Sequence, residues 1–324
     1  MEYRILTGTG LYVSPLCLGT MTFGDQVDEK SACEIIDFAV DQGINFIDTA
    51  DAYSHGECET IIGKAVKGKR DKVILATKVG YPVQAERGVN DVGLSRKYIL
   101  KAVEDSLKRL DTDYIDLYFM HRPVYDNPVE ETLDTLSTLV RSGKVRYIGV
   151  SNQAAWQICE EIWRSSARNY IAPAVTQNGY NMISRGVEQE LVPFLKQYKV
   201  GFVIYNPIAG GLLSGKHKFG APTPNTRFDG NKMYIDRYWQ EDNFKAIERL
   251  TAIAESGGMN LLELALRWCI SQKHVDSMLL GTSKLEQLCQ NIQLVGRGAL
   301  DASILEACDG VWKTLAGNRY QYNR

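Results

Sequence analysis

The chain has 324 residues, of which 44% are hydrophobic and 23% charged, and its formal net charge is -2 at pH 7. This composition is typical of a globular protein with a sizeable core, and it provides no basic stripe for nucleic acid. No apolar stretch approaches the roughly 18 residues of a membrane span, and no apolar segment of a secretory signal follows the first residue. We therefore expect a cytoplasmic protein that binds neither nucleic acid nor a membrane.

The cysteine and histidine content agrees with this expectation. The 7 cysteines are scattered and form no Cys-x-x-Cys pair, which is typical of reduced, buried thiols. The 4 histidines show no metal-ligand spacing, so we expect no metal site.

The chain begins with a predicted β-hairpin, whose strands at 3–6 and 11–13 flank a turn at 8–10. After it, eight short apolar stretches alternate with segments of helical periodicity. The predicted strands are 16–18, 44–47, 73–77, 115–120, 145–150, 174–177, 202–205 and 277–280. The predicted helices are 29–42, 57–67, 95–110, 128–142, 153–165, 186–198 and 242–272. This alternation implies parallel strands with right-handed crossovers, and the count of eight favours a closed (β/α)8 barrel over an open sheet.

Two features interrupt the regular alternation. The connection after the seventh barrel strand runs from 206 to about 242 and is rich in Gly and Pro, which is typical of a functional or disordered loop. Two further helices are predicted at 284–295 and 301–316. We find no linker or internal repeat, so the fold class is α/β: a single barrel domain over 1–324 with an N-terminal hairpin, a long loop after strand 7 and extra C-terminal helices.

Polar side chains stand at the carboxyl ends of several predicted strands, where the active sites of such barrels lie. Asp48 ends the second strand, and Tyr53 follows five residues later. Further along, Lys78, His121, Ser151, Asn152 and Gln177 hold corresponding positions. Each of these residues alone fits a structural position at the rim. Together they predict one active site.

The residue types suggest roles. A tyrosine has a pKa near 10, and a neighbouring ammonium such as Lys78 lowers it towards the range useful for proton donation. Asp48 can hold Lys78 in place, and a neutral His121 can orient a substrate carbonyl. The set contains no nucleophile–base pair, so the chemistry requires a cofactor.

Six stretches carry a family resemblance over essentially the full length: GINFIDTADAYSHGECE, ILATK, FMHRP, VSN, YNPIAGGLLSGK and GTSKLEQLCQN. In this order they resemble the aldo-keto reductase superfamily. The middle and later parts are more similar to its aflatoxin aldehyde and succinic semialdehyde reductase branch, through PVEETL, SNQAAW, TQNGYNMISRGVEQEL, RFDGN and RYW.

The resemblance implies an NADPH-dependent oxidoreductase of the alcohol dehydrogenase type, which reduces an aldehyde or ketone by hydride transfer from nicotinamide C4 without a metal. It places the catalytic tetrad at Asp48, Tyr53, Lys78 and His121, with Tyr53 as the proton donor. It places the cofactor contacts at Gly19, Thr20, Met21, Asp48, Ser151, Asn152, Gln177, Tyr205, Asn206, Pro207, Gly211, Leu212, Gly215, Lys216, Gly281, Ser283, Lys284, Gln287, Gln290 and Asn291. The chain departs from the family pattern at Val124, where that branch usually has an acidic residue, and at Gln287 and Gln290.

Two segments favour phosphate binding. Residues 210–217 nearly match a phosphate loop, but His217 replaces the final hydroxyl residue, so only the close approach of glycine amides remains. Residues 281–284 lead into a helix whose N-terminus favours an anion, so Ser283 and Lys284 are expected to prefer NADPH over NADH. The alternative for Ser283 is an ordinary helix cap.

The substrate expectations are less specific. Tyr81, Arg227 and Arg324 are candidates for the substrate pocket, and a guanidinium suits a substrate carboxylate, although Arg324 also fits a frayed tail. Two other functions stay open: a sugar or nucleotide-sugar ketoreductase, and a cofactor-sensing subunit similar to potassium-channel β-subunits. Against the latter, no extended N-terminal segment precedes the hairpin. The partners expected are a small carbonyl substrate and, at most, a second copy in a homodimer.

Overall fold

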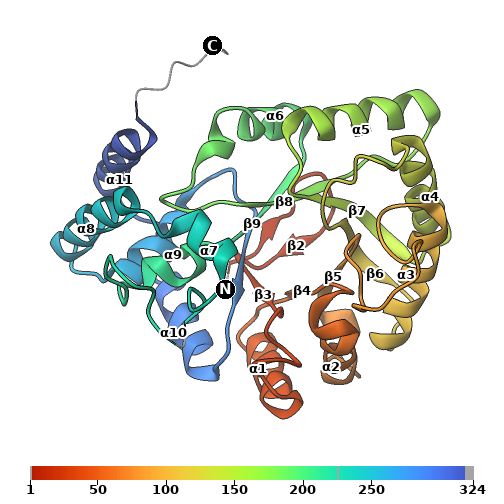
Figure 1. The fold of residues 1–324 in the computed structure, drawn as a ribbon, viewed down its shortest axis with the longest axis horizontal. Coiled ribbons are helices and arrows are strands. Elements are labelled where there is room, and N and C mark those ends of the chain that lie inside the picture. Colours follow the sequence, from red (N-terminus) through yellow and green to blue (C-terminus); the bar gives the residue numbers. More distant parts are fainter. Residues whose placement is uncertain (1, 225, 318–324) are drawn as a thin grey trace.

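A closed barrel of eight parallel strands forms the centre of the computed structural model, which describes residues 2–224 and 226–317 (Figure 1). The strands are β3 (Leu16–Gly19), β4 (Phe46–Asp48), β5 (Ile74–Val79), β6 (Ile115–Met120), β7 (Val145–Ser151), β8 (Val175–Gly179), β9 (Gly201–Tyr205) and β10 (Ser277–Gly281). Each strand pairs with the next along the chain, and β10 closes the barrel against β3. The predicted (β/α)8 barrel is confirmed.

Helices surround the barrel (Figure 1). They are α1 (Glu29–Asp41), α2 (Glu57–Ala65), α3 (Arg96–Arg109), α4 (Val129–Arg141), α5 (Ala155–Arg168), α6 (Leu191–Tyr198), α7 (Lys232–Tyr238), α8 (Glu241–Ser256), α9 (Leu261–Ser271), α10 (Leu285–Val295) and α11 (Ala302–Ala316). Several begin where a side chain satisfies a free backbone amide: Asp28 accepts from the Ser31 amide at 3.0 Å and Asn260 from the Glu263 amide at 2.9 Å. The two extra helices predicted near the C-terminus correspond to α10 and α11.

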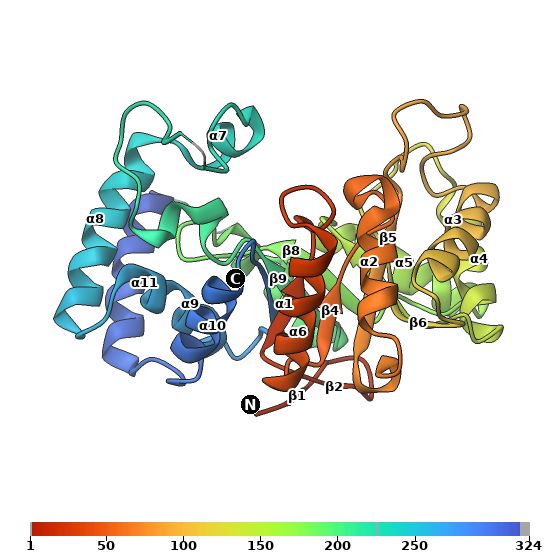
Figure 2. The ribbon, with the colours of Figure 1, turned by 90° about the horizontal axis from the view of Figure 1, so that it is seen from below.

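The N-terminal hairpin covers one end of the barrel, and α7 lies at the opposite end (Figure 2). The hairpin pairs β1 (Arg4–Ile5) with β2 (Tyr12–Val13) in antiparallel fashion. Leu6 and Val13 pack with Phe46 and Phe119 in the barrel interior. A Cβ atom on Gly149 would lie 2.4 Å from the Phe119 ring, so this ring fits only because the neighbouring strand carries a glycine there.

Three predicted elements differ from the structure. The helix predicted at 242–272 is two helices, α8 and α9, because Gly258 takes a φ of +69° and Asn260 then caps a new helix. The helix predicted at 186–198 is a 3-10 turn (Gly186–Glu188) followed by α6. The long connection after β9 contains a 3-10 segment (Ala209–Ser214) and α7, which we had predicted as loop.

The structure adds two general observations. Among the helices of the described residues, none combines the length and the apolar character needed to cross a membrane. All seven cysteines are free thiols. The single-domain interpretation stays a prediction.

Candidate active site

The barrel architecture explains why polar residues from different strands meet at one rim. Side chains alternate along a strand, so residues two positions apart point to the same side. On five strands, a residue of the barrel interior lies two positions before a polar or aromatic residue. The pairs, in chain order, are Phe46 and Asp48, Ala76 and Lys78, Phe119 and His121, Val175 and Gln177, and Val203 and Tyr205. Each of these five strands thus fills the barrel with an apolar side chain and then presents a polar or aromatic group at its carboxyl end.

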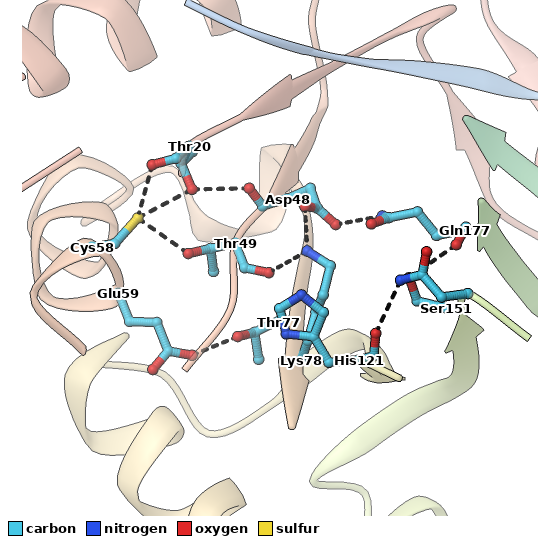
Figure 3. A network of polar contacts seen from close by, with 11 residues as sticks. Thr20, Asp48, Thr49, Cys58, Glu59, Thr77, Lys78, His121, Ser151 and Gln177 are labelled. Atoms are coloured by element: carbon cyan, nitrogen blue, oxygen red, sulfur yellow. Dashed lines mark hydrogen bonds and ion pairs between the residues drawn. The ribbon is translucent and has the colours of Figure 1, made fainter. Parts of the chain in front are cut away.

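A buried ion pair forms the centre of the site (Figure 3). Lys78 Nζ donates to Asp48 Oδ1 and, at 2.7 Å, to the backbone oxygen of Thr49, and both ionic side chains are almost fully buried. Gln177 Nε2 donates to the other Asp48 oxygen at 2.8 Å. Burial raises the pKa of Asp48, with Lys78 and Gln177 acting in the opposite direction. Burial lowers the pKa of Lys78, but Asp48, Tyr53 and Cys17 together outweigh it and the net direction is upward. Each charge is thus tolerated because its partner is present.

Tyr53 lies beside this pair. The Lys78 Nζ atom is 5.2 Å from the centre of the Tyr53 ring, and the His121 ring meets the Tyr53 ring edge-on at 5.8 Å. The next two residues, Ser54 and His55, have φ values of +46° and +56°. Hydrogen bonds from Ser54 Oγ to the Phe23 oxygen (2.7 Å) and between His55 Nδ1 and the Val83 oxygen (2.9 Å) hold this unfavourable turn. The direction of Tyr53 is therefore determined by the tertiary structure.

Burial is the main cause of the pKa shifts of both Tyr53 and His121. Burial raises the pKa of Tyr53 to about 12, and the Lys78 charge only partly opposes it. The net direction is the opposite of that expected from the sequence, because the desolvation of a phenolate outweighs one neighbouring ammonium here. Burial, together with the charges of Lys78 and Arg122, lowers the pKa of His121 well below its usual range. At neutral pH, Tyr53 is therefore protonated and His121 is neutral.

A second layer of hydrogen bonds holds the segment that carries Tyr53 (Figure 3). Cys58 Sγ lies 3.2 Å from the side-chain oxygens of both Thr20 and Thr49. Deeper in the structure, Glu59 accepts from Thr77 Oγ1 at 2.6 Å and pairs with Arg109 at 2.7 Å. These contacts connect α2 to the barrel strands, so the loop between β4 and α2 cannot shift independently of Lys78.

A cleft of about 300 Å³ opens over this cluster. Its lining includes three of the four tetrad residues, Asp48, Tyr53 and His121, while Lys78 lies beneath them. Of the other predicted cofactor residues, it includes Gly19, Thr20, Met21, Ser151, Asn152, Gln177, Tyr205, Asn206, Pro207, Gly211, Gly281, Ser283 and Gln287. One continuous cleft therefore runs from the catalytic cluster to the start of α10.

Other predicted site residues lie elsewhere. Leu212, Gly215, Lys216, Lys284, Gln290 and Asn291 do not line the cleft. Ser283 donates to Gln287 Oε1 from its amide (3.2 Å) and its hydroxyl (3.4 Å), whereas Lys284 is the N-cap residue of α10, so Ser283 does not have the helix-cap geometry of the alternative. Tyr81 does not line the cleft but contacts the His121 ring edge-on at 4.7 Å. Arg227 lines the cleft, and Arg324 lies outside the described residues.

The sequence analysis missed part of the lining. Thr22, Gln26, Ile208, Gly210, Tyr234, Arg237, Leu279, Leu280 and Thr282 also face the cleft. Tyr234 and Arg237 belong to α7. The sequence analysis does not predict this helix, because the connection that contains it is rich in Gly and Pro. The signal was present in Asn231, whose side chain accepts from the Tyr234 amide and caps the helix.

The donor set fits a nicotinamide dinucleotide. Ser151, Asn152 and Gln177 offer amide and hydroxyl groups at the end of the cleft near Tyr53. The Tyr205 ring lies over Gly179, where a Cβ atom would be 3.3 Å from the ring, and its hydroxyl donates to Asn152 Oδ1 at 2.5 Å. Gly211 has a φ of +109°, and a Cβ atom there would lie 3.9 Å from the His217 Nε2 atom, an ordinary van der Waals contact. The cleft thus offers a flat ring, amide partners and exposed backbone, which are suitable for a ring carboxamide and a pyrophosphate.

The comparisons with known proteins agree with this geometry. The aldo/keto reductase family matches residues 15–313. A protein from Bacillus subtilis named uncharacterized oxidoreductase YrpG is 37% identical over 98% of both chains. A probable voltage-gated potassium channel subunit beta from Arabidopsis thaliana is 36% identical over 91% of both. The human aflatoxin B1 aldehyde reductase member 2 is 34% identical over 95% of this chain and 89% of its own length.

These matches define the class of protein. The barrel, the buried Asp–Lys pair beside a tyrosine and the near full-length similarity are those of an oxidoreductase. The chain belongs to the aldo/keto reductase family.

Proposed function

We propose that this protein is an NADPH-dependent reductase that converts an aldehyde or ketone to an alcohol. The observation that carries the proposal is the convergence of Asp48, Tyr53, Lys78 and His121 at one end of a cleft suited to a dinucleotide. NADPH, when bound, supplies the hydride from its nicotinamide C4. The protein supplies the orientation, the proton and the exclusion of water.

The residues divide this work. Ser151, Asn152 and Gln177 would hold the carboxamide of the nicotinamide, and the Tyr205 ring would offer it a flat apolar face. His121, neutral, donates a hydrogen bond that directs the substrate carbonyl towards Tyr53. Its Nδ1 atom is buried without a hydrogen-bond partner among the described residues.

Tyr53 then donates its proton to the carbonyl oxygen. Burial keeps this hydroxyl protonated at neutral pH, and the Lys78 ammonium stabilises the phenolate that remains. Asp48 holds Lys78 charged and in position. Lys78 acts on the reaction through Tyr53 and does not reach the cleft.

The test is a panel of aldehydes, ketones and sugars assayed with NADPH and with NADH and reported as kcat/KM. We expect turnover of small aldehydes with a preference for NADPH. The absence of turnover for every carbonyl, with tight NADPH binding, would contradict the reductase function. A marked preference for sugars or nucleotide sugars would favour a ketoreductase of that class.

A second function has one observation in its favour, the similarity to proteins named as potassium channel β subunits. Those relatives are 36% identical to this chain, compared with 34% for the aldehyde reductases. Sequence identity therefore does not distinguish a channel subunit from a reductase. A cofactor-sensing subunit would bind NADPH in the same cleft with very slow turnover. Reduction of 4-nitrobenzaldehyde at an ordinary enzymatic rate, about 1 s⁻¹ or faster, would favour the enzyme.

The proposal also includes the cellular compartment and the oligomeric state. All seven cysteines are free, which fits a reducing cytoplasm. We propose a monomer or homodimer that acts on a small carbonyl substrate.

A further inference from the structure

A second cavity lies behind the barrel rim, between the N-terminal ends of α4 and α5. It encloses about 170 Å³, and its described lining shares no residue with the active-site cleft. Leu94, Met120, Val124 and Leu133 provide apolar walls. A protein cavity of this size accommodates a molecule of roughly the size of benzene.

Two buried polar side chains, Gln153 and Glu161, form part of its lining. They are only 4% and 7% exposed, and Gln153 Nε2 donates to Glu161 Oε1 at 2.8 Å. The remaining atoms, Gln153 Oε1 and Glu161 Oε2, are buried without a hydrogen-bond partner within residues 2–224 and 226–317. Both are acceptors when the carboxyl is ionised, and leaving them unpaired is unfavourable. In the ionised state, these two acceptors can therefore take hydrogen bonds from a donor on a ligand.

The charge of the lining favours a cationic donor. Besides Glu161, the titratable groups of the described lining are Glu160 on α5 and Tyr125 on the loop after β6, and that lining includes no lysine, arginine or histidine. Glu160 is paired with Arg164 at 2.7 Å and is unavailable to a ligand at the cavity floor. Burial raises the pKa of Glu161 to about 8, against the hydrogen bond from Gln153, so a bound cation would stabilise its ionised form.

Two aromatic side chains frame the entrance. Trp156 is 58% exposed and Tyr125 is 77% exposed, although both line the cavity. Exposed aromatic rings next to a buried carboxyl provide an apolar wall and, for a cation, a favourable ring face.

We propose that this cavity is a binding site for a small organic cation: a primary ammonium or amidinium group on an apolar body about as large as benzene. The N–H groups donate to Glu161 Oε2 and Gln153 Oε1, and the body packs between Met120, Leu133 and Trp156. The proposal does not depend on the reductase function, since it concerns a different cavity and is tested by binding.

The site lies close to the catalytic rim. Gln153 directly follows Asn152, and the Gln153 backbone oxygen accepts from Asn178 Nδ2 on β8 at 3.1 Å. A ligand there contacts the segment that presents Asn152 without entering the cleft.

The experiment is a titration of the purified full-length protein with benzylamine and with benzyl alcohol at pH 8, followed by tryptophan fluorescence and calorimetry. The alcohol is the matched neutral probe. We expect saturable benzylamine binding that is at least about tenfold tighter than that of the alcohol, because the ligand forms charge-assisted hydrogen bonds. Equal affinities, or no saturable benzylamine binding, would show that the cavity holds only water or any apolar molecule, and would overturn the proposal.

Two variants locate the contact. Glu161→Gln preserves the shape and the hydrogen bond with Gln153, and we expect it to weaken benzylamine binding at least about tenfold while leaving benzyl alcohol unchanged. The matched control Glu160→Gln should change the affinity by less than about threefold. An equal loss in both variants would contradict a specific role of Glu161.

The pH dependence gives an independent readout on the unmodified protein. Because the cation selects the ionised carboxyl, the affinity should rise about tenfold per pH unit from pH 6 to 7.5 and level off above pH 8. Binding at pH 7 should release close to one proton, measurable by calorimetry in two buffers. An affinity that does not change between pH 6 and 8 would overturn the assignment of Glu161.

Discussion

At the scale of the residue, the site depends on the competition between burial and charge at Tyr53. A phenol with a pKa of about 12 is a weaker acid than the sequence alone suggests, but it is fully protonated at the pH of the cell. The Lys78 ammonium is held by Asp48 and by the backbone oxygen of Thr49, and Gln177 in turn donates to Asp48. The surroundings of Tyr53, the proposed proton donor, therefore make it less acidic on balance, although Lys78 acts in the other direction.

Tyr53→Phe tests this role directly. We expect kcat for aldehyde reduction to fall about 10²- to 10⁴-fold, because the proton donor is removed, while the Kd for NADPH stays nearly unchanged. Steady-state kinetics and fluorescence titration with NADPH measure the two quantities.

The matched control is Tyr12→Phe, an exposed tyrosine of the hairpin at the other end of the barrel. It should retain wild-type activity. Retention of more than about a tenth of kcat in Tyr53→Phe would show that another group donates the proton.

At the scale of the element, we propose that α10 and the segment before it hold the far end of the cofactor. Lys284 is the exposed N-cap residue of α10, and the Ser283 amide and hydroxyl are bonded to Gln287. A 2′-phosphate would have to replace Gln287 as the partner of Ser283. The Lys284 side chain forms no hydrogen bond or ion pair with the residues that the structure describes, so it can approach the phosphate without breaking one.

Lys284→Glu should therefore raise the KM for NADPH about tenfold and leave the KM for NADH within about twofold, because only NADPH carries the 2′-phosphate. Steady-state kinetics with both cofactors measures the effect. The control Lys30→Glu, on the exposed face of α1, should change neither value. Equal effects on the two cofactors would exclude a phosphate contact at Lys284.

The connection from β9 to α8 brings Arg227 and α7 to the cleft, so we propose that it influences the choice of substrate. Arg227 Nη1 donates to the Tyr234 hydroxyl at 3.3 Å, and its guanidinium lies 5.3 Å from the Tyr234 ring centre. The guanidinium is thus held at the cleft by a helix that itself lines the cleft. This arrangement suits a substrate with a distal carboxylate.

For Arg227→Met we expect the KM for succinic semialdehyde to rise about tenfold, with little change in kcat and little change for its methyl ester. The comparison of kcat/KM for the acid and the ester measures the effect. Lys218→Met, an exposed basic residue of the same connection, is the control. If the wild-type enzyme uses acid and ester equally well, Arg227 does not recognise a carboxylate.

At the scale of the whole molecule, the barrel interior is closed at one end by the N-terminal hairpin. Leu6 and Val13 are fully buried against the strands. Thr7 Oγ1 donates to Asp276 Oδ1 at 3.0 Å, which joins the start of the chain to the segment before β10. The hairpin is thus part of the core of the barrel.

Leu6→Ala should lower the free energy of unfolding by about 2–5 kcal/mol, because it leaves a cavity in a closed interior. Chemical denaturation followed by circular dichroism measures this change. Ile5→Ala is the matched control, since Ile5 is the residue next to Leu6 and its side chain is 53% exposed. This substitution should lower the free energy of unfolding by less than about 1 kcal/mol. Similar losses in both variants would contradict a core role for the hairpin.

The sequence by itself determined the barrel and the positions of the catalytic candidates. Strand periodicity and length are local properties, and in a parallel barrel the carboxyl ends of all strands meet at one rim. Asp48, Lys78 and His121 could therefore be assigned to one site without knowledge of any contact between them.

Only the tertiary structure decided the features that depend on packing between distant segments. The break between α8 and α9 and the presence of α7 depend on caps and glycine conformations that the apolar pattern conceals. The direction of the pKa shift of Tyr53 depends on desolvation, and packing leaves one Glu161 oxygen without a partner among the described residues. The desolvation of a group depends on all the atoms that pack around it, and those atoms come from distant segments of the chain. The sequence alone does not identify them.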